Sequence, residues 1–166
     1  MTIHGLLNPL DPPLGWINAP VHVHSLAARP VLLHFWNHHD ERTREQWPRL
    51  LAELEPRVRA GLAVVGVHVA RQGDDLDSQV LEEVVQDIGF PYPVAIDDGL
   101  PSHSIAVAHG VTELPSFLLF NAEGRLMGSV IRPAELEGLG DALDVLLDQA
   151  QAARIEASAE ASAPGP

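Results

Sequence analysis

Apolar and polar residues follow one another along the chain in blocks that predict alternating strands and helices. Residues 31–36 and 62–70 are almost continuously apolar, which is typical of strands covered on both faces. Between them, Asp40 stands as an N-cap before an apolar stripe at helical spacing, formed by Trp47, Leu50, Leu51 and Leu54. This pattern predicts a helix that Pro48 should kink.

The rest of the chain continues the alternation. Residues 21–24 alternate with period two, which predicts a half-exposed strand. A helix is expected over 78–88 with Gly89 as its C-cap, then a short strand over 92–96 and a short helix over 102–109. Residues 117–120 and 126–131 flank a turn at 121–124 and predict a hairpin. A final helix begins at Pro133 and buries one leucine face, formed by Leu136, Leu139, Leu143, Leu146 and Leu147.

This order of elements predicts an α/β fold with a mixed central β-sheet and helices on both faces. Residues 1–20 are rich in proline, glycine and asparagine and predict an irregular N-terminal lead-in. Residues 21–153 then form the single domain. Residues 154–166 have little apolar surface to bury and predict a disordered tail.

The amino-acid composition excludes several kinds of catalytic and metal-binding chemistry. The chain has no cysteine and no lysine, which excludes disulfides, thiolate catalysis, zinc–thiolate sites and Schiff-base chemistry. The formal net charge of −13 argues against a nucleic-acid partner. No apolar run is long enough for a membrane helix, and the first 20 residues do not form a signal peptide, so a cytoplasmic location away from membranes is expected.

The segment around residues 31–48 resembles the active-site strand and helix of thioredoxin-like proteins of the TlpA/ResA type. Phe35-Trp36 are followed by three linking residues, then by Asp40-Glu41-Arg42-Thr43 and by Arg44-Glu45-Gln46-Trp47-Pro48. Residues 15–18, 61–68 and 92–97 resemble a subgroup that includes DipZ-like proteins and the thioredoxin-like domain of NHL-repeat proteins. Residues 110–115 resemble the family loop whose proline, here Pro115, follows a cis peptide bond. The resemblance spans residues 15–147 and implies a thioredoxin-like fold.

The resemblance fails at the two residues that carry the family's chemistry. Asp40 stands where the family has its nucleophilic cysteine, and Thr43 where it has the resolving cysteine. Thiol–disulfide exchange needs a thiolate, so a carboxylate and a hydroxyl cannot perform it. The sequence therefore predicts a redox-inactive relative of thiol–disulfide oxidoreductases, with Asp40 as an N-cap that keeps a negative charge at the former thiolate position.

Several histidines are candidates for a role at this vestigial site or elsewhere in the chain. The resemblance places His34 beneath the helix, where a neutral ring could hydrogen-bond the Thr43 hydroxyl; it is either a general base or a core histidine. His34, His39 and Asp40 are weak candidates for a metal site, against which an exposed polar loop is the alternative, and no metal or other cofactor is predicted. His68 lies near the end of a central strand, a common place for ligands in such folds. His22 and His24 could chelate a metal but are more simply a solvent-facing edge.

Two hypotheses for function follow. In the first, the chain is a binding or scaffold module whose recognition surface is the loop at residues 37–43 plus the loop at Leu114 and Pro115. The binding residues expected there are Trp36, His38, His39, Leu114 and Pro115. Its expected partner is an extended peptide or protein, because in the family the loop before the cis-proline pairs with peptide backbone. The alternative for Pro115 is that it is kept only because the turn requires a cis bond. The alternative is a non-thiol enzyme that uses His34, His39, Asp40 or Thr43 for acid–base or metal-assisted chemistry.

Overall fold

A six-stranded mixed sheet forms the centre of the computed structural model, which describes residues 5–71, 73–74, 77–102, 104–130 and 136–162. The strand order is β1-β4-β3-β2-β5-β6. The three inner neighbours β4, β3 and β2 are parallel, while β1, β5 and β6 each run antiparallel to the strand beside them. The strands span Trp16–Ile17 (β1), Val31–Trp36 (β2), Ala63–Val69 (β3), Val94–Asp97 (β4), Ser116–Phe120 (β5) and Leu126–Val130 (β6).

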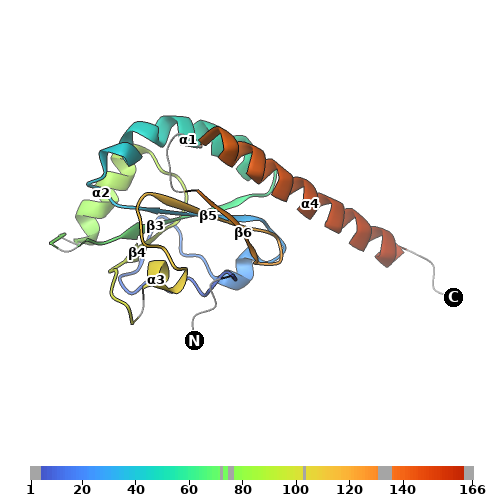
Figure 1. Ribbon diagram of the computed structural model, residues 1–166, viewed down its shortest axis with the longest axis horizontal. Helices are drawn as coiled ribbons and strands as arrows, with labels where there is room; N and C mark the ends of the chain where they lie inside the picture. The colour runs from blue at the N-terminus through green and yellow to red at the C-terminus, as the bar shows by residue number, and fades with distance from the viewer. Residues whose placement is uncertain (1–4, 72, 75–76, 103, 131–135, 163–166) are drawn as a thin grey trace.

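Helices cover both faces of this sheet (Figure 1). They are α1 (Glu41–Arg59), α2 (Ser78–Ile88), α3 (Ile105–Ala108) and α4 (Leu136–Ser162), with a 3₁₀ helix at Val23–Leu26. Leucines and aromatic residues of α1, α2 and α4 form one core cluster with one face of the sheet. α3 and the N-terminal lead-in pack on the other face. The predicted α/β fold with a mixed sheet and helices on both faces is confirmed.

Most predicted elements are found within one or two residues of their expected ends. The strand at residues 31–36 is completely buried, and the helix at 78–88 ends at Gly89 with a φ of 78°. α1 begins after Asp40 and continues through both Pro48 and Pro56. Four leucines of α4 are buried on one face, as expected: Leu139, Leu143, Leu146 and Leu147. The expected helix start at Pro133 lies outside the described residues.

The predicted strand at residues 21–24 is wrong. This segment leads into the 3₁₀ helix Val23–Leu26 instead. Ser25 donates both its backbone N–H and its hydroxyl to the His22 carbonyl, at 2.9 and 2.6 Å. Such local side-chain bonds compete with strand pairing, and they outweigh the alternating pattern here. The rings of His22 and His24 consequently stack, with centroids 5.4 Å apart, instead of projecting side by side from a strand.

Two described segments, near either end of the chain, contain more regular structure than the sequence predicts. In the lead-in, β1 pairs with β4, and the Asn8 backbone N–H donates to His109 Nε2 at 3.0 Å. At the other end, α4 continues to Ser162 as an exposed helix, where a disordered tail from residue 154 is expected. Alanine and glutamate in this stretch favour helix even without tertiary contacts, which accounts for the difference. Within the described residues, no helix is long and apolar enough to cross a membrane.

The sheet brings three segments to one edge of the molecule. β2 ends at Trp36 directly before α1, and its parallel neighbour β3 ends at Val69. β5 runs antiparallel to β2, so its first residue, Ser116, pairs with Phe35 at the same edge. The loop before β5 therefore lies beside the N-terminus of α1, and together they contain most of the candidate site residues.

Candidate functional site

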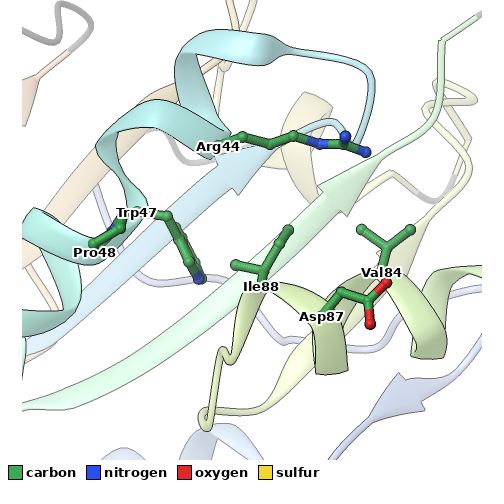
Figure 2. A pocket seen from close by; sticks show the side chains of 6 residues that line it. All are labelled: Arg44, Trp47, Pro48, Val84, Asp87 and Ile88. Carbon is green, nitrogen blue, oxygen red and sulfur yellow. The ribbon is translucent and has the colours of Figure 1, made fainter.

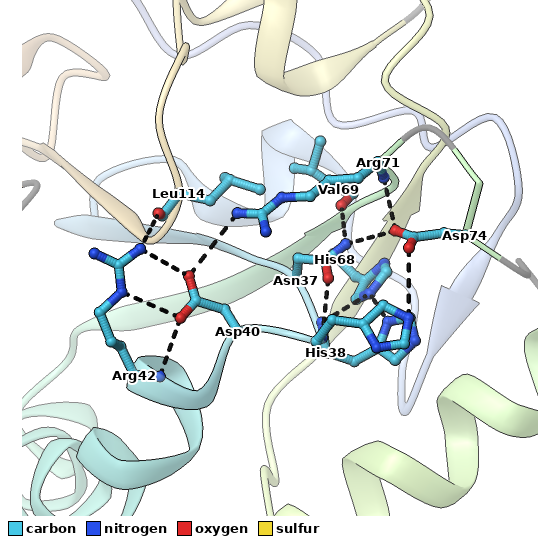
Figure 3. A network of polar contacts seen from close by, with 10 residues as sticks. Asn37, His38, Asp40, Arg42, His68, Val69, Arg71, Asp74 and Leu114 are labelled. Carbon is cyan, nitrogen blue, oxygen red and sulfur yellow. Dashed lines mark hydrogen bonds and ion pairs between the residues drawn. The ribbon is translucent and has the colours of Figure 1, made fainter.

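The Asp40 carboxylate caps α1 and is surrounded by arginine (Figure 3). Its Oδ1 accepts the Arg42 backbone N–H at 3.0 Å, and the Arg42 guanidinium lies 3.3 Å from both carboxylate oxygens. Arg71 Nη2 is 3.9 Å from Oδ2. The Asp40 side chain is only 6% exposed, against 62% for Arg42 and 48% for Arg71. The site therefore presents two guanidinium groups to solvent and keeps its carboxylate underneath.

Arg42 also connects the helix to the loop before β5. The peptide bond between Leu114 and Pro115 is cis. The Arg42 guanidinium donates to the Leu114 carbonyl at 3.5 Å, so one side chain contacts both Asp40 and this loop. Leu114 is half-buried, whereas Pro115 is buried.

His34 lies in the middle of β2, beneath α1. Its ring stacks on Phe117 with centroids 4.4 Å apart and packs 5.3 Å from Trp47. Complete burial lowers the pKa of His34 to about 3, so the ring is neutral at physiological pH. The hypothesised hydrogen bond to Thr43 is not formed: His34 Nδ1 and Thr43 Oγ1 are both buried, and neither has a partner among the described residues.

A pair of histidines joins the loop before α1 to the end of β3. His38 Nδ1 lies 2.7 Å from His68 Nε2, and the same His68 nitrogen accepts the His38 backbone N–H at 3.3 Å. His68 Nε2 is therefore the acceptor, and the shared proton resides on His38 Nδ1. Burial, and secondarily His38, lowers the pKa of His68 to about 4. Burial, and secondarily His39, lowers the pKa of His38 as well.

Asp74 contacts two other residues of the loop before α1, Asn37 and His39. Its Oδ2 accepts from the Asn37 amide and from the Arg71 backbone N–H, both at 2.7 Å, and its Oδ1 lies 3.4 Å from His39 Nε2. Burial acts to raise the pKa of Asp74, but these hydrogen bonds outweigh it and the net pKa is lowered. Asn37 also donates to the Val69 carbonyl at 2.8 Å. The Asn37 amide therefore connects the loop before α1 both to the end of β3 and to Asp74 beyond it.

Comparisons with known proteins agree on one fold. The chain superposes on a thioredoxin-like protein in the oxidized form, whose solution structure is known, with a TM-score of 0.76 and 23% identity over 90% of this chain and 99% of the other. A thiol-disulfide isomerase from Corynebacterium glutamicum gives 0.75 and 20% over 87% and 96%. The chain has a thioredoxin-like fold.

Curated relatives support the same conclusion. The thiol-disulfide oxidoreductase YkuV of Bacillus subtilis is 28% identical over 113 residues, which are 68% of this chain and 74% of YkuV. DipZ of Mycobacterium tuberculosis is 26% identical over 88 residues, which are 51% of this chain but only 13% of DipZ. No family model matches the chain. Since the chain has no cysteine, the exchange chemistry named for YkuV has no thiolate here to carry it.

Some of the residues expected to bind a partner are buried in this fold. Trp36 is 1% exposed and packs edge-to-face on His68, with centroids 5.0 Å apart. It therefore cannot contribute to a recognition surface, and the corresponding expectation is wrong. Of the five expected binding residues, His38 and Pro115 are also buried, while His39 is exposed and Leu114 is half-buried.

The proposed acid–base and metal residues contact different neighbours. His34 stacks on Phe117, His39 faces Asp74, and Asp40 is held by Arg42. Among the described residues, no group of three or more histidine, aspartate or glutamate side chains is arranged to hold a metal ion. Nothing in these contacts favours the non-thiol enzyme.

Two polar residues of the site, Arg71 and Asp74, were missed by sequence reasoning, whereas Asn37 and Arg42 lie in the loop at residues 37–43 that the sequence assigned to the recognition surface. A signal was available, because Asn37 follows β2 and Arg71 follows β3, and these strands are parallel neighbours. Polar side chains after adjacent parallel strands meet at one edge of a sheet, where such folds commonly bind ligands.

Proposed function

We propose that this thioredoxin-like chain is a binding module without thiol chemistry, and that it binds an extended peptide segment. Its binding surface would consist of the exposed part of the loop and first helical turn at residues 37–43, together with Leu114, which precedes the cis-proline. The Arg42 bridge from Asp40 to the Leu114 carbonyl carries the proposal. This bridge connects the N-terminus of α1 to the loop that contains the cis-proline, although residues 40 and 43 are not cysteines.

The charges of this surface suggest what the peptide contains. Arg42 and Arg71 expose their guanidinium groups, while the carboxylate between them is nearly buried. An acidic side chain of a partner would pair with these cations without displacing Asp40 from the helix N-terminus. At 3.5 Å the hydrogen bond from Arg42 to the Leu114 carbonyl is long, so a peptide N–H can replace it.

Selection from a library of extended peptides, followed by NMR mapping, tests the proposal. We expect selected peptides to be enriched in aspartate or glutamate and to shift amide resonances of residues 37–43 and 114. Arg42→Gln should weaken their binding about two- to fivefold, because an exposed ion pair contributes about 0.2–1 kcal/mol.

Arg125→Gln is the matched control, since Arg125 is 70% exposed and lies in the β5–β6 hairpin, away from the Asp40 contacts. Its binding should equal that of the wild type. If the selected peptides shift other surfaces, or if Arg42→Gln and Arg125→Gln bind equally well, the proposed surface is wrong.

A further inference from the structure

A hollow between α1 and α2 lies outside the surface at residues 37–43. Its volume is about 370 Å³, which falls within the roughly 300–1,000 Å³ of ligand pockets. Figure 2 shows its walls, which come from both helices: Arg44, Trp47 and Pro48 from α1, and Val84, Asp87 and Ile88 from α2. Most of this lining is apolar, with one cation and one anion.

The indole N–H of Trp47 has no acceptor in this wall. Trp47 is 3% exposed, and its Nε1 is buried without a hydrogen-bond partner among the described residues. Figure 2 shows the ring extending from α1 toward Ile88, with the nitrogen at its far end. Because Nε1 has almost no accessible surface, a ligand in the hollow would pack against the indole ring and would not reach this N–H.

Two opposite charges face the same hollow from different helices. Arg44 on α1 and Asp87 on α2 are both exposed, and in the described part of the chain neither takes part in an ion pair or side-chain hydrogen bond. A simple anion would be attracted to Arg44 but repelled by Asp87. A simple ammonium ion would be attracted to Asp87 but repelled by Arg44. A molecule that carries both charges next to an apolar group complements all of these features.

We propose that the hollow binds a free α-amino acid with an apolar side chain. Its carboxylate would pair with Arg44, and its ammonium group would pair with Asp87. The apolar side chain would pack against Pro48, Val84 and Ile88. This site is independent of the peptide surface proposed above.

Titration of the ¹⁵N-labelled protein with L-phenylalanine tests this site, with the indole N–H resonance of Trp47 as the reporter. We expect a saturable shift of this resonance, because the ligand would pack beside the indole ring. 3-Phenylpropionate and phenethylamine, which each keep one charge, should bind about two- to fivefold more weakly. If no saturable shift occurs, or if either analogue binds as tightly as phenylalanine, the proposal is overturned.

Substitutions at the two charged residues provide a second test, and both residues are exposed, so the fold should be retained. Arg44→Gln should lower affinity for phenylalanine but not for phenethylamine, and Asp87→Asn should improve binding of 3-phenylpropionate. Glu83→Gln is the control, because Glu83 is exposed on α2 and is not among the residues that line the hollow. Unchanged ligand preference in both variants would contradict the assigned charges.

Discussion

At the residue scale, the buried histidines make stability depend on pH. Burial holds the pKa of His34 at about 3 and that of His68 at about 4, below the ordinary 6.5 that each regains on unfolding. Below pH 6.5 the unfolded chain therefore binds more protons than the folded one. The stability from keeping both rings neutral is complete above pH 6.5 and is lost as the pH falls toward 3–4.

His34→Leu should weaken this dependence. As the pH falls from 6.5 to 4.5, a histidine that is buried and neutral lowers the free energy of unfolding by roughly 1 kcal/mol per pH unit. The variant lacks this contribution. At pH 7.5 we expect a change of about 1 kcal/mol or less, since the lost stacking on Phe117 is offset by removal of an unpartnered nitrogen.

Urea unfolding at pH 7.5, 6.0 and 5.0 measures both effects. His24→Gln, at an exposed histidine, should follow the wild-type pH dependence. If His34→Leu loses as much stability on acidification as the wild type does, His34 is not the group that titrates.

Asp40 combines a cap with a charge, and two substitutions separate these roles. Asp40→Ala removes the acceptor of the Arg42 backbone N–H and should destabilise the protein by about 0.5–2 kcal/mol. Asp40→Asn keeps a good N-cap and should lose less, because only the ion pair with the half-exposed guanidinium groups disappears. Equal losses in urea unfolding would show that the charge, not the cap, matters most.

At the scale of elements, α4 consists of a packed half and an exposed half. Leu139, Leu143, Leu146, Leu147 and Ala150 are buried, but every residue from 151 to 162 is exposed, and this end of the helix extends beyond the body of the molecule (Figure 1). Most helical stability comes from packing an apolar face, so the two halves should contribute very differently to the fold.

Deleting residues 155–166 should therefore change the free energy of unfolding by less than about 1 kcal/mol while reducing the helical circular dichroism signal. Leu143→Ala, in the packed half, should destabilise by about 2–5 kcal/mol, since Leu143 is fully buried. A deletion as damaging as Leu143→Ala would mean that the exposed half stabilises the domain.

Elements with strong local patterns could be predicted from sequence, and those governed by competing contacts could not. The continuous apolar run at 31–36 and the capped helix at 78–88 have the predicted bounds because local pattern and burial agree. Residues 21–24 fail because Ser25 bonds back to His22. The site is harder still: Asn37 meets Asp74 across 37 residues of chain, and no local pattern encodes that contact.

For the whole molecule, the strand order explains why the segments of the candidate site meet at one edge of the sheet. β2 lies between β3 and β5, so the start of α1, the end of β3 and the cis-proline loop meet whatever residues occupy positions 40 and 43. Core packing fixes this arrangement, because β2 is completely buried. The arrangement of this edge therefore does not depend on cysteines at positions 40 and 43.

Because the strand order places these segments together whatever residues occupy positions 40 and 43, two substitutions should give the chain thiol–disulfide exchange activity. The double variant Asp40→Cys, Thr43→Cys should form a disulfide and reduce insulin in the presence of dithiothreitol, whereas the wild type should not. Position 40 lies at a helix N-terminus between Arg42 and Arg71, which should hold the pKa of the new thiol below the ordinary value of about 8.5.

Asp40→Cys alone is the control, because a single thiol can form a mixed disulfide but has no resolving partner and should not turn over. Reaction of the double variant with iodoacetamide across pH gives the thiol pKa independently of turnover. A double variant that folds and forms its disulfide yet reduces no insulin would show that Arg42, by occupying the Leu114 carbonyl, blocks substrate access as well. Arg42→Ala in that background should then recover activity, since it removes the contact between α1 and the cis-proline loop.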